Sequence, residues 1–193
     1  GGRRLESALE KIDDAAVPLQ ALVYLRAGNF WIGWEDDKAA LYAGKSLALF
    51  RQLGDEKGVA WAIRLQGNYT YDKRDFEKAV PILEQSLRLA EELDDRALIT
   101  WNYHHLGWIA LAGADYLAAA NLGDLALAIA LETGDGRAQA NLLFLLGETA
   151  NRQGEFIQAE ALYSQALVIA RNLKDSLIVA RILNQMGEAA RRQ

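Results

Sequence analysis

The sequence predicts an all-α fold in which pairs of antiparallel helices repeat every forty residues. Three observations support this: a fixed period, helical spacing of apolar residues within each period, and acidic residues where helices should begin. A shift by forty residues aligns four columns of one residue type without insertion or deletion. The columns are Gly67, Gly107, Gly147, Gly187; Asp55, Asp95, Asp135, Asp175; Ala39, Ala79, Ala119, Ala159; and Leu47, Leu87, Leu127, Leu167.

Each period contains a first and a second helix joined by a tight turn. In the second period the helical spacing covers about 56–72 and 75–93. Acidic side chains suit helix starts because they accept hydrogen bonds from the first free amides and favour the positive end of the helix dipole. The expected N-caps are Asp55, Asp95, Asp135 and Asp175 for first helices, and Asp75, Asp115 and Glu155 for second helices.

These signals place about four and a half repeats along the chain. The expected pairs lie at about 16–53, 55–93, 95–133 and 135–173, followed by a fifth first helix at 175–191. The segment near 5–12 is expected to be the end of a preceding second helix. Because the chain opens with Gly1-Gly2 and stops within an apparent helix, we expect residues 1–193 to be a single repeat array cut from a longer protein.

The composition disfavours several classes of protein. Apolar residues make up 51% of the chain, enough for a sizeable core, and a formal net charge of -5 disfavours nucleic acid as a partner. Without cysteine there is no disulfide or thiolate chemistry. No apolar run is long enough for a bilayer, and no signal peptide is visible. We therefore expect a soluble, cytoplasmic protein that binds neither nucleic acid nor membranes.

Small residues recur where the two helices of a pair should approach closely. A glycine is followed after twelve residues by an alanine and after seven more by another small residue, and an aromatic residue follows the turn. The sets are Gly67, Ala79, Ser86; Gly107, Ala119, Ala126; and Gly147, Ala159, Ala166; the aromatic residues are Phe76, Tyr116 and Phe156. In this pattern the chain resembles the tetratricopeptide repeat family.

That resemblance implies a right-handed α-solenoid, a tetratricopeptide-like superhelix with a concave face lined by first helices. The unit here is forty residues, longer than the family's usual thirty-four or so. The first repeat departs most from the family's pattern, because it has Ala27 in the glycine column and Asp36 in the aromatic column. Long units of this kind are similar to sensor regions of large bacterial signal-transduction ATPases and transcription regulators. The resemblance therefore implies a signalling context.

The sequence offers no convincing catalytic, metal or cofactor site. His104 and His105 are adjacent, so on a helix they diverge by about 100 degrees and do not suit one metal ion. His105 shares a column with Leu65 and Leu145, which predicts a partly buried packing role. Gly44-Lys45-Ser46 lacks the earlier glycine and strand of a phosphate-binding loop. We therefore expect no enzymatic activity, no metal and no cofactor.

The repeats can be compared with one another to find a binding surface. One stripe of each first helix is uniformly small or apolar, as packing requires, whereas the stripe displaced by two residues varies and is rich in aromatic and polar side chains. The family resemblance places this second stripe in the concave groove. The predicted groove residues are Tyr24, Trp31, Trp61, Arg64, Asn68, Tyr71, Trp101, His104, Trp108, Asn141, Phe144, Glu148 and Asn151. The alternative is that the tryptophans pack between neighbouring first helices.

Three functions remain open at this stage. The first is a non-catalytic protein-interaction module, a sensor or scaffold that holds a protein or peptide segment in the groove. The second is a small-molecule sensor in which tryptophans stack on an oligosaccharide or an aromatic ligand. The third is a structural spacer that associates weakly with copies of itself through its cut ends.

Overall fold

A computed structural model describes residues 9, 12 and 15–192 of the chain. Between Val17 and Arg192 the described residues form α-helices joined by short turns, which confirms the all-α fold of helix pairs. Most of the helix expected near 5–12 lies outside the described residues. In the described part of the chain, no helix combines the length and the apolarity that crossing a membrane requires.

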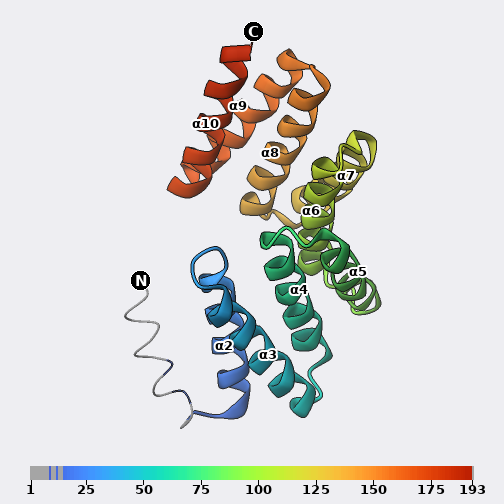
Figure 1. Cartoon of the computed structure of the whole chain (residues 1–193), viewed down its shortest axis with the longest axis vertical. Helices are drawn as coiled ribbons and strands as arrows, with labels where there is room; N and C mark the ends of the chain where they lie inside the picture. Colours follow the sequence, from blue (N-terminus) through green and yellow to red (C-terminus); the bar gives the residue numbers. More distant parts are fainter. Residues whose placement is uncertain (1–8, 10–11, 13–14, 193) are drawn as a thin grey trace. The chain divides into compact units, whose positions relative to one another are not determined.

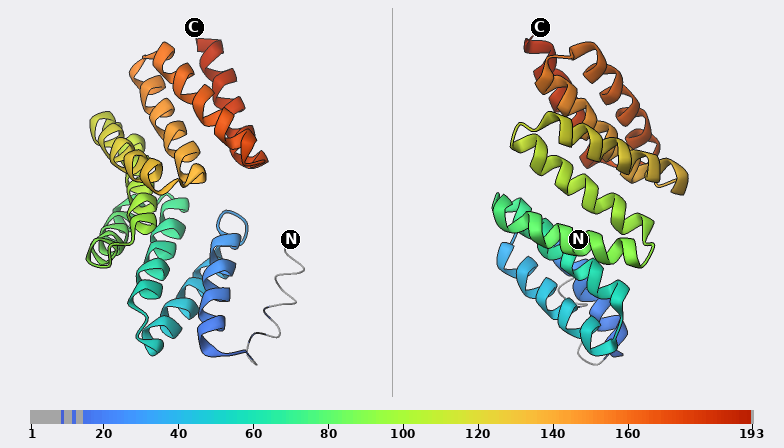
Figure 2. Two further views of the ribbon diagram at one scale, coloured as in Figure 1. Left: turned by 180° about the vertical axis from the view of Figure 1, so that it is seen from behind. Right: turned by 90° about the vertical axis from the view of Figure 1, so that its right-hand side faces the viewer.

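The chain divides into two compact units, residues 1–95 and 96–193, called here the N-terminal and the C-terminal unit. Helices that are neighbours in the sequence pack on each other within each unit, as Figures 1 and 2 show. The N-terminal unit contains α2 (Val17–Trp31), α3 (Asp36–Leu53), α4 (Glu56–Asp72) and α5 (Phe76–Glu92). The C-terminal unit contains α6 (Arg96–Ala112), α7 (Tyr116–Thr133), α8 (Gly136–Gln153), α9 (Phe156–Asn172) and α10 (Ser176–Arg192).

First helices also contact one another within each unit. In the N-terminal unit α2 packs on α4, and in the C-terminal unit α8 packs on both α6 and α10. Alternate helices therefore form a row, which is the arrangement expected of stacked helix pairs. We call the surfaces of these rows the first-helix faces: α2 and α4 in one unit, and α6, α8 and α10 in the other.

The small-residue columns lie where helices approach most closely. A β-carbon built on Gly67 would lie 2.6 Å from Leu83 Cδ2, and one on Gly147 would lie 2.6 Å from Tyr163 Cε1. The alanine and third small-residue columns are at most 1% exposed: Ala79, Ala119 and Ala159, with Ser86, Ala126 and Ala166. The spacing of small residues thus reports helix contact within a pair.

Two serines of this third column donate hydrogen bonds from inside the core. Ser46 Oγ donates to the carbonyl oxygen of Ala21 at 3.0 Å, and Ser86 Oγ donates to that of Ala60 at 3.0 Å. Both serines are fully buried. The hydroxyl of Ser46 therefore connects α3 to α2, which accounts for a serine in Gly44-Lys45-Ser46 without any phosphate ligand.

Aspartate side chains cap most helices as expected. Asp55, Asp115 and Asp135 accept from the amides of Gly58, Ala118 and Ala138 at 2.9–3.0 Å, and Asp75 and Asp175 make longer bonds of the same kind. The prediction of a side-chain cap at Glu155 is wrong, because its carboxylate makes no hydrogen bond to α9. Glutamate has one more methylene than aspartate and is not among the preferred N-cap residues.

Each turn between helices α2 to α10 places one residue in the left-handed region. At the end of a second helix this residue is glycine in two repeats, Gly54 and Gly134, but Asp94 and Lys174 in the others, with φ of 48° and 56°. At the turn inside a pair, Gly154 has φ of 81°, whereas Ala114 has φ of 61°. A side chain at such a φ costs roughly 1–2 kcal/mol, which glycine avoids.

We expect Ala114→Gly and Lys174→Gly each to raise the free energy of unfolding by about 0.5–1 kcal/mol. Glycine removes the backbone strain but loses more conformational entropy on folding, so the net gain is smaller than the strain. Urea denaturation of the single variants checks this. Gly134→Ala is the matched control and should be destabilising; a loss of stability in Ala114→Gly would contradict the prediction.

Candidate functional site

All the predicted groove residues lie on first helices, and none of them is fully exposed. The half-buried ones are Trp61, Asn68, Tyr71, Trp101 and Trp108. The buried ones, each at most 8% exposed, are Tyr24, Trp31, Arg64, His104, Asn141, Phe144, Glu148 and Asn151. Contact with a partner stays a prediction for all of them, and the half-buried side chains are the ones a partner would meet first.

Both the indole N–H and the ring of Trp61 contact other residues of the N-terminal unit. Its Nε1 donates to Asp95 Oδ2 at 2.9 Å, and Lys57 Nζ lies 3.1 Å from the same oxygen. The ring packs against a core cluster from α2, α3 and α4 that includes Leu25 and Leu65. Trp61 therefore belongs partly to the core, while the rest of its half-buried ring reaches the surface.

Arg64 carries a buried positive charge that no carboxylate neutralises. The side chain is 6% exposed, and among the described residues no Asp or Glu oxygen lies within 4.0 Å of it. Its contacts are a long hydrogen bond from Nη2 to Asn29 Oδ1, at 3.4 Å, and the ring of Trp61, whose centroid lies 5.1 Å from Cζ. Its Nε has no hydrogen-bond partner. Burial lowers the pKa of the Arg64 guanidinium to about 10.

Asn29, on α2, is a residue that the sequence argument missed. Its Nδ2 donates to the carbonyl oxygen of Leu25 at 3.0 Å, which turns Oδ1 toward Arg64. Its column reads Asn29, Tyr69, Ile109 and Thr149, so it varies between repeats as the predicted groove columns do. That variation was the signal that could have identified it.

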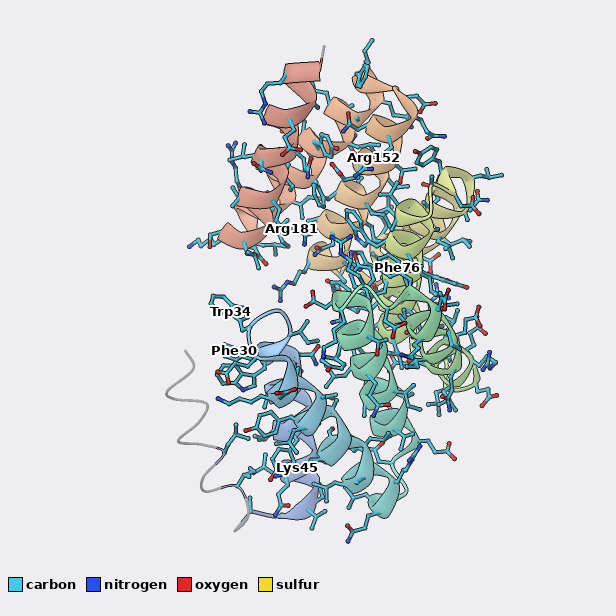
Figure 3. All side chains as sticks on the ribbon, in the orientation of Figure 1. Phe30, Trp34, Lys45, Phe76, Arg152 and Arg181 are labelled. Carbon is cyan, nitrogen blue, oxygen red and sulfur yellow. The ribbon has the colours of Figure 1, made fainter. Side chains whose placement is uncertain are left out.

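The two predicted aromatic residues of α2 are covered by lysines of α3. Lys38 Nζ lies 4.3 Å from the centroid of the Trp31 ring, and Lys45 Nζ lies 5.0 Å from that of Tyr24. Tyr24 also stacks on Tyr42, with centroids 5.8 Å apart. Figure 3 shows Lys45 on this part of the N-terminal unit. These rings are therefore already occupied by cations of the chain itself.

The histidine segment of α6 is an internal polar and aromatic cluster. Trp108 Nε1 donates to His104 Nε2 at 3.0 Å, so this nitrogen of His104 acts as an acceptor. His105 Nδ1 lies 2.7 Å from the carbonyl oxygen of Trp101, and His105, at 7% exposed, is buried as its packing column predicted. Within the described residues, no group of three or more His, Asp or Glu side chains is placed to hold a metal ion.

The tryptophans of α6 also share their surface with the core. Trp101 packs against a cluster from α7 and α8 that includes Ala126 and Leu142, and Trp108 packs against two clusters around Leu145 and Phe144. The packing alternative therefore describes part of these half-buried rings, and the groove stays a prediction for the part that is not covered. An experiment on them must therefore separate loss of binding from loss of stability.

On α8, an aromatic ring, a carboxylate and an amide share one face of the helix. The ring of Phe144 lies 5.6 Å from that of Trp108 and 5.9 Å from that of Tyr163, between centroids. Glu148 accepts a hydrogen bond from the hydroxyl of Tyr163. Asn151, one turn further along, has a buried Oδ1 without a partner. Tyr163 lies on second helix α9, outside the columns in which the sequence argument searched.

Asn141 lies at the other end of the same face and has a local role. Its Nδ2 donates to the carbonyl oxygen of Arg137 at 2.9 Å. A cavity of about 390 Å³ lies at the turn from α9 to α10, and no predicted groove residue is among its lining residues. Its lining consists of Arg137, Leu173, Lys174, Asp175, Ser176 and Leu177.

The comparison with protein families identifies one segment. Residues 138–193, which cover α8, α9 and α10 apart from the first residues of α8, match the tetratricopeptide repeat. No curated protein matches the chain. The matched segment contains the last complete glycine, alanine and small-residue set, Gly147, Ala159 and Ala166.

Solved structures with the same fold extend over almost the whole chain. Aspartyl phosphate phosphatase F from Bacillus subtilis matches with a TM-score of 0.76 and 13% identity, over 92% of this chain and 47% of that one. The apo form of RapI matches with a TM-score of 0.72 and 18% identity, over 92% and 66%. The present chain thus spans about half to two thirds of the length of these proteins.

A third structure links the fold to a sensor region. It is a signal transduction ATPase with numerous domains from Pyrococcus horikoshii that carries a tetratricopeptide repeat sensor. The TM-score is 0.69 at 16% identity, over 96% of this chain and 28% of that one. The repeat period, the tight glycine contacts and these matches agree: residues 138–193 match the tetratricopeptide repeat, and the chain has a tetratricopeptide-like fold of stacked helix pairs.

Proposed function

We propose that this chain is a non-catalytic interaction module that binds a protein or peptide segment on its first-helix faces. The fold is typical of protein-interaction modules. The observation that carries the proposal is Arg64, a buried guanidinium near which no carboxylate of the described residues lies within ion-pair distance. Such a charge is costly to leave unpaired, and an acidic group from a partner would satisfy it.

The surroundings of Arg64 suit an acidic peptide segment. Arginine binds carboxylates through two parallel hydrogen bonds, and its Nε is still without an acceptor. The half-buried Trp61, Asn68 and Tyr71 lie on the same helix and offer aromatic area and an amide for a peptide backbone. Together they would hold one acidic side chain and the residues next to it.

A sensor role fits this proposal. The structurally similar region of the Pyrococcus horikoshii protein is named as a tetratricopeptide repeat sensor. We propose that this chain, in the cytoplasm, acts as a sensor through a protein or peptide partner. The competing ligands are a small molecule and a second copy of the chain. Binding measurements distinguish these two from a protein or peptide partner.

The test uses fluorescein-labelled peptides with a single Asp or Glu scanned along a neutral sequence, and the matching Asn or Gln peptides. In fluorescence anisotropy, acidic peptides should bind on the order of tenfold more tightly than their amide counterparts, because one charged hydrogen-bonded contact is lost. Arg64→Gln should abolish that difference. Arg88→Gln, which removes an exposed arginine of α5, is the matched control and should leave it intact.

Two results would overturn the proposal. If no peptide of either series binds while oligosaccharides raise the melting temperature, the chain is a small-molecule sensor. If no probe binds and the mass measured by light scattering rises with protein concentration, the chain is a self-association module.

A further inference from the structure

The first-helix face of the C-terminal unit contains aromatic rings with a cation resting on them. The guanidinium carbon of Arg181, on α10, lies 5.0 Å from the ring centroid of Phe144 and 6.0 Å from that of Trp108. Figure 3 shows Arg181 on the C-terminal unit. These distances are within the range in which a cation is attracted to the face of an aromatic ring. The cluster therefore already holds a positive group supplied by the chain.

Glu148 adds a negative charge to the same face. It is 5% exposed, and among the described residues no lysine or arginine nitrogen lies within 4.0 Å of its carboxylate. Its hydrogen-bond donor is the neutral hydroxyl of Tyr163, whose ring contacts Phe144. A buried carboxylate is normally paired with a cation, so this one lacks the partner that its burial calls for.

Asn151 independently indicates that a hydrogen-bond donor is missing from this face. It lies three residues after Glu148 and seven after Phe144, so all three share one face of α8. The side chain is 6% exposed, and its Oδ1 is buried without a hydrogen bond. A buried amide oxygen of this kind is satisfied by an N–H donor.

We propose that this face, formed by Trp108, Phe144, Glu148 and Asn151, binds a lysine or arginine side chain of a peptide partner. The incoming cation rests on the two rings, pairs with Glu148 and donates a hydrogen bond to Asn151. A cationic side chain with several N–H donors thereby meets all three features: the ring faces, the unpaired carboxylate and the amide oxygen. The inference rests on the proposed function, which it refines by naming the chemistry of a second contact.

Arg181 is the resident occupant that the partner displaces. Its side chain is exposed, so it can swing into solvent without unfolding α10. Removing Arg181 should therefore favour the partner's cation, whereas removing the charge of Glu148 should disfavour it.

The experiment scans a single arginine along a neutral fluorescein-labelled peptide and compares each probe with the same peptide carrying citrulline, the neutral isostere of arginine. We expect arginine peptides to bind the wild-type chain on the order of tenfold more tightly than citrulline peptides. Glu148→Gln, which can still accept from Tyr163, should reduce the preference to less than about threefold. Glu160→Gln, at an exposed position of α9, is the matched control and should leave it unchanged.

Arg181→Gln provides a second test that does not alter the core. It should increase the affinity for arginine peptides, and the indole N–H resonance of Trp108 should shift on their addition. Equal binding of arginine and citrulline peptides, or weaker binding by Arg181→Gln, would overturn the inference. If acidic peptides still require Arg64, only this inference fails; if neither series binds, the proposed function fails as well.

Discussion

Replacing Gly147 with alanine is expected to lower the free energy of unfolding by about 1–3 kcal/mol. The new β-carbon would lie 2.6 Å and 2.7 Å from two carbons of the Tyr163 ring. That ring is 1% exposed and its hydroxyl is bonded to Glu148, so it has little room to move. Overpacking of this kind outweighs the roughly 1 kcal/mol that alanine gains over glycine in helix propensity.

Gly187 provides a matched control because it lies in the same column of the repeat. A β-carbon there meets no atom within 4 Å, so Gly187→Ala should be neutral or stabilising by up to about 1 kcal/mol. Urea denaturation followed by circular dichroism measures both variants. Equal effects at the two positions would show that the glycine column reflects something other than contact with Tyr163.

Replacing Arg64 with methionine is expected to stabilise the free protein by about 1–2 kcal/mol near neutral pH. The lowering of the pKa of Arg64 to about 10 corresponds to roughly 3 kcal/mol of unfavourable desolvation. Methionine keeps most of the side-chain volume, but it gives up the contact with Trp61 and leaves Asn29 Oδ1 without its donor. The net gain is therefore smaller than the desolvation cost.

The difference in stability between Arg64→Met and wild type should change with pH in one direction. Since burial lowers the pKa of Arg64 in the folded state to about 10, below its value in the unfolded chain, the folded state binds fewer protons than the unfolded chain above about pH 10. Wild-type stability relative to Arg64→Met should therefore be constant near neutral pH and rise above about pH 10. Urea denaturation of both proteins at about pH 7, 9 and 10.5 measures the difference. A methionine variant less stable than wild type at pH 7 would contradict the argument.

The repeat sequence predicts packing within a helix pair more completely than it predicts the candidate sites. Gly147 and Ala159 could be assigned from columns because small residues recur at these positions wherever helices approach closely, although the side chain that contacts the glycine differs between repeats. The bond between Tyr163 and Glu148 occurs in one repeat and joins two helices, so no column could reveal it. The same holds for Arg64 and Asn29, whose meeting depends on the rotamers of side chains from α2 and α4.

Burial was the property hardest to infer from the periodic pattern. Phe144 and His104 occupy variable columns, yet they are 4% and 8% exposed, because neighbouring aromatic rings cover them. A helical stripe gives the direction of a side chain but not the size of the residues around it. Asn141, Glu148 and Asn151 of α8 illustrate this, since they are at most 8% exposed although the sequence placed them at a surface.

The distribution of tryptophans gives this protein a built-in optical probe. Trp34, at the turn from α2 to α3, is 83% exposed and is labelled in Figure 3, whereas the other four tryptophans of the chain lie on first helices and are buried or half-buried. The long-wavelength part of the tryptophan fluorescence emission thus arises mainly from Trp34. With that one residue changed to phenylalanine, the remaining indole fluorescence arises from the two first-helix faces alone, so its wavelength and quenching would follow their occupancy without any attached dye.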